Sequence, residues 1–175
     1  IVSSPTPTGF GMPTLTYLGI DVLRLPFIRD TSLGHEVLHN WWGNGVYPDY
    51  ATGNWSEGLT TFMADHAYRE QAGTEAALEM RLAWLRDFAA LGSAADRPLS
   101  PFTSRTHGAD QVVGYHKAAM VFLMLRAALG AQAVVDGLGQ ADLRARLVAA
   151  DADVVLHHVD DAELGVIPQQ HQQRQ

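Results

Sequence analysis

The pattern His-Glu-x-x-His at residues 35–39 constrains this chain more than any other feature. It lies in a segment, residues 32–42, that is expected to form a helix. Residues four apart share one helix face, so His35 and His39 can present their imidazoles to a single point. Two neutral imidazoles on one face suit zinc, and Glu36 can act as a base on a water molecule bound there. A catalytic zinc takes three protein ligands, so the third must come from elsewhere in the chain.

Composition limits what that third ligand can be. The chain has no cysteine, so any metal must be held by His, Asp or Glu. Its 175 residues, 47% hydrophobic and 18% charged, suffice for one domain with its own core. The net charge of −7 argues against general nucleic-acid binding, which requires a basic face.

The sequence gives little information about where the protein is found. It shows no long apolar run and no signal-peptide layout, so we expect no membrane segment and find no targeting signal. Residue 1 is not Met, and we therefore expect the chain to be a piece of a longer precursor. Compartment and oligomeric state stay open.

Residues 1–30 have strand and turn character, because prolines and glycines interrupt any helix there. Residues 14–20 alternate in polarity and are rich in β-branched and aromatic types, which predicts a strand. Residues 22–28 are apolar and contain Pro26, and we expect them to be extended or irregular.

Three more helices are expected after the His-Glu pattern, at residues 54–72, 74–91 and 111–129, each followed closely by a stop signal or a loop. The last is apolar nearly all round, which predicts that it is buried. The long loop before it, residues 92–110, has a length that is often functional. After Gly139 the pattern weakens. A helix at 142–150, a strand at 154–159 and a polar tail at 168–175 are the expectations there.

Glu57 is the candidate for the third metal ligand. It begins the second of these helices and is the only acidic residue in a short stretch otherwise suited to packing. Its spacing from Asn54 also fits a capping box, in which the carboxylate would bond to the backbone at the helix start. The two roles compete for one carboxylate.

Three segments in this order resemble the M1 zinc aminopeptidases, which belong to the thermolysin-like metallopeptidases, the gluzincins. They are His35-Glu36-Val37-Leu38-His39-Asn40-Trp41-Trp42-Gly43-Asn44, Asn54-Trp55-Ser56-Glu57-Gly58 and Tyr115-His116-Lys117-Ala118-Ala119-Met120. The resemblance spans about residues 9–125. It implies one Zn²⁺ bound by His35, His39 and Glu57, with Glu36 as general base and Tyr115 assisting catalysis. A packed aromatic on a buried helix is the alternative reading of Tyr115.

Two departures from the family pattern stand out. Seventeen residues separate His39 from Glu57, one fewer than is usual in the family. The family also has a Gly-x-Met-Glu-Asn strand whose Glu binds the substrate's amino group. Here Gly11 and Met12, the candidate substrate-binding residues of that strand, are followed by Pro13, and the Glu is missing.

The resemblance implies a mainly α (α+β) fold, a thermolysin-like catalytic domain with a small N-terminal β-element. We assign it to residues 1–138, followed by a weakly defined extension, 139–167, and the tail, 168–175. The implied function is zinc-dependent hydrolysis of peptide bonds, as an aminopeptidase acting on peptide substrates. The alternatives are an endopeptidase or glycyl-aminopeptidase-like enzyme with the same zinc site, or an inactive peptide-binding relative.

Several further residues are weaker candidates. Asp65 or His66 could hydrogen-bond a ligand histidine, and His107 could reach the substrate cleft from its loop. His157 and His158 are adjacent in an expected strand and would point to opposite faces, so they make a poor chelate. The tryptophans are interpreted as core residues: Trp41, Trp42, Trp55 and Trp84.

Overall fold

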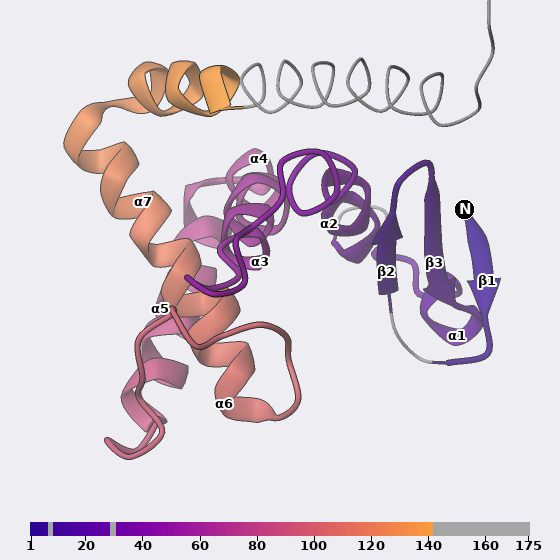
Figure 1. Cartoon of the computed structure of the whole chain (residues 1–175), viewed down its shortest axis with the longest axis horizontal. Coiled ribbons are helices and arrows are strands. Elements are labelled where there is room, and N and C mark those ends of the chain that lie inside the picture. Colours follow the sequence, from indigo (N-terminus) through magenta and orange to yellow (C-terminus); the bar gives the residue numbers. More distant parts are fainter. Residues whose placement is uncertain (7–8, 29–30, 142–175) are drawn as a thin grey trace, which may run out of the picture.

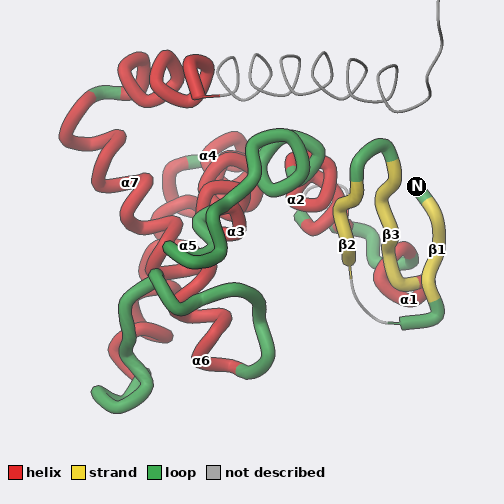
Figure 2. Tube along the Cα trace, viewed as in Figure 1, coloured by secondary structure: helices red, strands yellow, loops and turns green. Residues whose placement is uncertain are grey.

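The computed structural model describes residues 1–6, 9–28 and 31–141, and it is mainly helical with a small three-stranded sheet. The sheet lies at one end of the molecule and the helices follow from it in chain order (Figures 1 and 2). Helix α2, Ser32–Leu38, lies between the sheet and the other helices and contacts both. The expected combination of helices with a small N-terminal β-element is confirmed.

The sheet has the order β1-β3-β2, with strands Val2–Ser4, Leu15–Gly19 and Gly9–Met12. Strand β1 pairs with β3 in parallel and β2 pairs with β3 antiparallel. The β2–β3 turn is tied to the end of α2, because the Thr14 backbone N–H donates to Asn40 Oδ1 at 3.0 Å. The expected strand at 14–20 is therefore present. The expectation for residues 22–28 is wrong at its start, where helix α1, Ile20–Leu23, continues directly from β3.

Two long helical runs form the central part of the molecule, and each contains a π-helical segment. The first run consists of α3, η2 and α4, at Ser56–Thr60, Thr61–His66 and Ala67–Ala72. The second consists of α6, η3 and α7, at Gly108–Gln111, Val112–Lys117 and Ala118–Leu129. Helix α5, Thr74–Ala90, joins them through a loop. All three helices predicted after the His-Glu pattern are confirmed, with shifts of a few residues at their starts.

The core forms where the two runs cross. Its buried members are Trp42, Leu59, Phe62, Trp84, Ala119 and Leu123. Gly58 allows the close crossing, because a Cβ there would collide with the Cβ of Ala118. The core thus fixes α3, which carries Glu57, against the helix that follows Tyr115.

Helix α7 is not buried as its apolar sequence predicted. Met124 and Leu129 are 66% and 62% exposed, and Val121 and Leu125 are also exposed. The reason is geometric: α3 and η2 pack against one face of α7, and Arg126 on that face pairs with Glu70 of α4, while the opposite face meets no other described helix. Trp41, expected in the core, is exposed, whereas Trp42 and Trp84 are buried. Trp55 packs against the core at its edge.

One helical stretch in the described part of the chain, Gly108–Leu129, is long and apolar enough to cross a membrane by length and composition alone. Residues 131–141 are helical as well. The elements expected at 142–150 and 154–159, and the tail at 168–175, lie outside the described residues. The division of the chain at residue 138 stays a prediction.

Candidate metal centre

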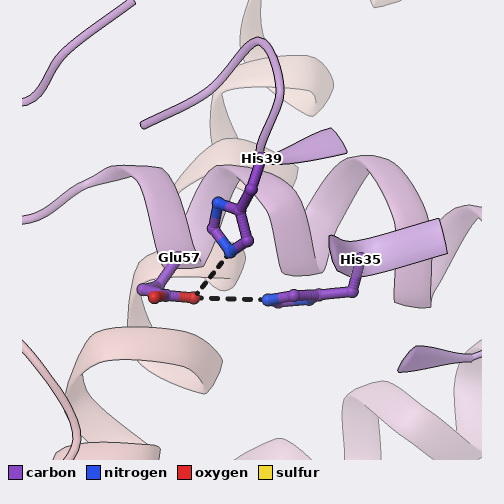
Figure 3. Close-up of side chains that lie close together, drawn as sticks. All are labelled: His35, His39 and Glu57. Carbon is purple, nitrogen blue, oxygen red and sulfur yellow. Dashed lines mark hydrogen bonds and ion pairs between the residues drawn. The ribbon is translucent and has the colours of Figure 1, made fainter. Parts of the chain in front are cut away.

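Two histidines and one glutamate converge on a single point (Figure 3). His35 Nε2 and His39 Nε2 each lie 3.2 Å from the same oxygen, Glu57 Oε2. His35 lies within α2, His39 is the residue directly after this helix, and Glu57 lies in the first turn of α3. All three ligand atoms lie within 4.8 Å of one another. The predicted third ligand is therefore beside the predicted pair.

The capping role considered for Glu57 is not formed. The helix begins at Ser56, and Asn54 Oδ1 accepts hydrogen bonds from the Ser56 backbone N–H at 3.1 Å and from its hydroxyl at 2.6 Å. Asn54 thus satisfies the helix start without Glu57. This leaves the Glu57 carboxylate free to turn toward the two imidazoles.

The outward nitrogens of both imidazoles are also engaged. His35 Nδ1 lies 2.9 Å from Asp65 Oδ2, and His39 Nδ1 lies 2.9 Å from the Trp42 carbonyl oxygen. A carbonyl can only accept, so His39 Nδ1 carries a proton and its Nε2 is the nitrogen available to a ligand. Such contacts behind a metal-binding histidine fix its orientation and tautomer.

Asp65, and not His66, has the supporting role that the sequence left open between them. His66 is fully buried in the core, where its ring packs against Trp84 and accepts a hydrogen bond from Arg81. Spacing alone does not choose between them, because the helical run that carries both residues is π-helical at Thr61–His66 and departs there from the regular α-helical repeat.

The charges of the cluster are strongly coupled. Burial opposes the charged form of His35, but hydrogen bonds to Asp65 and Glu57 outweigh it and raise the pKa of His35 to about 10. Burial alone would raise the pKa of Glu57, yet its hydrogen bonds to His35 and His39 lower that pKa to about 2. Without a metal, His35 is therefore a charged imidazolium that faces the charged carboxylate of Glu57.

Glu36 faces the same cleft from α2. Burial raises the pKa of Glu36, while the neighbouring imidazoliums and a backbone hydrogen bond from Gly11 oppose that rise. Strand β2 packs directly on this region: a Cβ on Gly9 would lie 2.8 Å from Glu36 Cδ, and one on Gly11 would lie 2.6 Å from His39 Cβ. The absence of side chains at both glycines lets the strand approach the site.

Tyr115 lies on η3 and lines the same cleft. Its ring stacks on His35 with centroids 6.1 Å apart and planes at 18°. Burial and the nearby Glu57 carboxylate raise the pKa of Tyr115, so its hydroxyl keeps its proton at neutral pH. Tyr115 thus lines the cleft beside His35 and keeps a proton that its hydroxyl can donate.

The cluster opens into a cleft of about 710 Å³. Gly11 lines it, together with Gly9 and Phe10, whereas Met12 does not. His107 is also outside the lining; it lies on the surface and its Nδ1 pairs with Asp110 at 2.6 Å. His157 and His158 fall outside the described residues. The cleft also contains side chains that the sequence did not single out: Tyr50, Arg69, Arg105 and Gln111.

The donor set fits a metal ion. Zinc binds nitrogen and carboxylate oxygen at about 2.0 to 2.2 Å, which separates tetrahedral ligands by about 3.3 to 3.6 Å. The two nitrogen–oxygen separations of 3.2 Å already match this spacing. The group formed by His35, His39 and Glu57 can therefore hold a metal ion.

No protein-family model, curated protein or solved structure matches this chain. The likeness to the M1 aminopeptidases therefore rests on the sequence motifs and stays a prediction.

Proposed function

We propose that this chain is a zinc-dependent hydrolase that cleaves peptide bonds, with a thermolysin-like arrangement of its catalytic domain. One observation carries the proposal: two imidazole nitrogens and one carboxylate oxygen converge while both outward imidazole nitrogens are hydrogen-bonded. Imidazole and carboxylate ligands without thiolate are typical of catalytic zinc sites of the His₂Glu type. We assign His35, His39 and Glu57 as the ligands.

Bound zinc would polarise the scissile carbonyl and make its water molecule a stronger acid. Glu36 then has the chemistry of a general base, because its carboxylate faces the cleft and burial raises its pKa toward the range useful for proton transfer. The same carboxyl group can pass that proton to the leaving amine. Tyr115 keeps its proton and can donate to the oxygen that gains negative charge.

Strand β2 offers a place for the substrate backbone. Its partner β3 occupies one edge, and residues Gly9 to Gly11 line the cleft at the other. An extended peptide could add to this edge only by displacing bonds that the Gly11 backbone already makes, with Glu36 and with Asn44 Nδ2 at 3.0 Å. We propose that the enzyme removes residues from the N-terminus of peptides. Internal cleavage is the alternative, favoured by Pro13 in the position where the family carries its amine-binding Glu.

Two measurements test the proposal. Metal analysis of the purified protein should give one zinc per chain, and His39→Ala should lose it. Glu36→Gln should keep the zinc but lose hydrolysis by about 10²- to 10⁴-fold, since general-base catalysis contributes that much. Glu79→Gln, on the exposed surface of α5, is the matched control and should change neither.

Substrate panels then separate the alternatives. Cleavage of aminoacyl-anilides but not of N-acetylated peptides supports an aminopeptidase, and cleavage of the acetylated peptides supports an endopeptidase. A protein that binds zinc and cleaves neither panel would be a peptide-binding relative. Full activity in Glu36→Gln would remove Glu36 from the mechanism.

A further inference from the structure

The cleft carries two arginines, Arg69 and Arg105, although the chain has a net charge of −7. Within the described residues, neither pairs with a carboxylate. Other arginines there do: Arg24 with Asp21, Arg97 with Asp110 and Arg126 with Glu70. An arginine left without a counterion in a cleft is available to an anionic ligand.

Arg105 lies in a loop that is held in one conformation. The buried carboxylate of Asp110 accepts hydrogen bonds from the Thr106 backbone at 2.8 Å, the Thr106 hydroxyl at 2.6 Å and the His107 backbone at 3.1 Å. Arg97 also donates to it. The hydrogen bonds from Thr106, above all, hold the pKa of Asp110 well below its usual range, so the carboxylate stays charged. The backbone immediately after Arg105 is thereby fixed.

The guanidinium of Arg105 is also oriented. Its Nη1 donates to Gln111 Oε1 at 2.6 Å, and Gln111 lines the same cleft. Arg105 is close enough to Tyr115 that its positive charge opposes the rise that burial causes in the pKa of Tyr115. A guanidinium has five N–H donors, and the hydrogen bond to Gln111 is the one that the described residues show for Arg105.

We propose that Arg105, oriented by Gln111, determines specificity by binding a carboxylate of the peptide substrate near the scissile bond. The carboxylate belongs either to an acidic side chain or to the substrate's own C-terminus. The inference rests on the proposed function, and it adds a substrate class: peptides that place a negative charge beside the cleaved bond. Arginine suits this role because its planar fork matches a carboxylate with two parallel hydrogen bonds.

The acids of the cleft agree with this reading. The carboxylates among the described lining residues are Glu36, Glu57 and Asp65, and each already has a role at the metal centre. The described lining thus offers an uncommitted positive group for a substrate carboxylate.

The test uses the full chain loaded with zinc and peptides in matched pairs. Each pair differs by Glu against Gln at one position near the cleaved bond, and each peptide is made with a free and with an amidated C-terminus. Binding to Glu36→Gln is measured by calorimetry alongside hydrolysis by the unchanged protein. Binding therefore tests the role of Arg105 even if no peptide is cleaved. A failure to cleave any peptide would refute the proposed function and not the role of Arg105 in binding.

In one of the two comparisons, Glu against Gln or free against amidated C-terminus, we expect the peptide with the carboxylate to bind about tenfold more tightly than the neutral peptide, as for a hydrogen bond to a charged group. Preference for Glu assigns a side-chain carboxylate, and preference for the free C-terminus assigns the terminal one. Arg105→Gln should abolish the preference and Gln111→Ala should reduce it. Arg86→Gln removes the same charge from the exposed surface of α5 and should keep it.

Three outcomes would overturn the inference. They are equal binding of every matched pair, a preference that survives Arg105→Gln, and a preference that is lost in Arg69→Gln but not in Arg105→Gln. Circular dichroism spectra of each variant show whether a loss of binding reflects a loss of fold.

Discussion

Asp65 provides the sharpest test of the metal centre, because the site depends on it without its being a ligand. Its carboxylate accepts from His35 Nδ1 at 2.9 Å, with side chains only 24% and 11% exposed. Asp65→Asn keeps an acceptor but removes the charge. Hydrogen bonds to charged groups contribute about 1.5 to 3 kcal/mol and neutral ones about 0.5 to 1.5. The loss is then about 1 to 1.5 kcal/mol, a ~5- to 12-fold weaker zinc affinity.

Asp65→Ala removes the acceptor as well and leaves the Nδ1 proton of His35 without a partner. The expected loss is the full contribution, ~10- to 100-fold in zinc affinity, as for other residues that orient a metal-binding histidine. Zinc affinity is measured by competition with a chelator at fixed pH. Thermal unfolding of the metal-free variants separates loss of the site from loss of the fold.

Asp87→Asn is the matched control for Asp65. Asp87 lies 3.2 Å from His116, another lining residue, and touches no proposed ligand. It should leave zinc affinity unchanged while removing the same charge from the neighbourhood. Equal weakening by Asp65→Asn and Asp87→Asn would reduce the effect of Asp65 to general electrostatics. Unchanged affinity in Asp65→Ala would refute its supporting role.

Two further predictions concern stability. Gly11→Ala should lower the free energy of unfolding by about 1 to 3 kcal/mol, because the added Cβ overpacks β2 against α2. Urea unfolding measures this loss. Gly137→Ala is the control and should not destabilise the protein, because a Cβ there meets nothing within 4 Å. In the metal-free protein, the raised pKa of His35 stabilises the fold below pH 6.5 and less as pH rises toward about 10. The lowered pKa of Glu57 stabilises it above pH 4.5 and less as pH falls toward about 2. The free energy of unfolding, measured against pH at fixed temperature, should be greatest between pH 4.5 and 6.5. A free energy that does not change with pH would contradict the interaction between His35 and Glu57.

Zinc should reverse the alkaline part of that profile. Ligand histidines must lose their protons to bind metal, so zinc affinity rises with pH while the imidazolium contribution of the metal-free protein declines. The two profiles, measured on the same preparation with and without zinc, distinguish a metal site from a simple ion pair.

The sequence alone was enough to predict two of the three residues of the candidate metal site, His35 and His39. His35 and His39 share a face because of the helix repeat, which is a local property. The role of Glu57 was harder to predict, because its carboxylate could either bind a metal ion or cap the start of the helix. Asn54 decided between them by satisfying the start of α3 itself, and that hydrogen bond is visible only in the folded chain.

Tertiary structure decided what lies around those ligands and what stays exposed. The sequence pattern of α7 predicted burial, but burial depends on how many faces of a helix its neighbours cover, and the other helices cover only one face of α7. The selection of Asp65 over His66 and the arrival of Arg105 in the cleft also depend on helix packing and on a loop fixed by Asp110. The helical repeat, a local property of the sequence, determined that His35 and His39 share one face. Packing between distant segments determined what surrounds them, because such contacts leave no periodic pattern in the sequence.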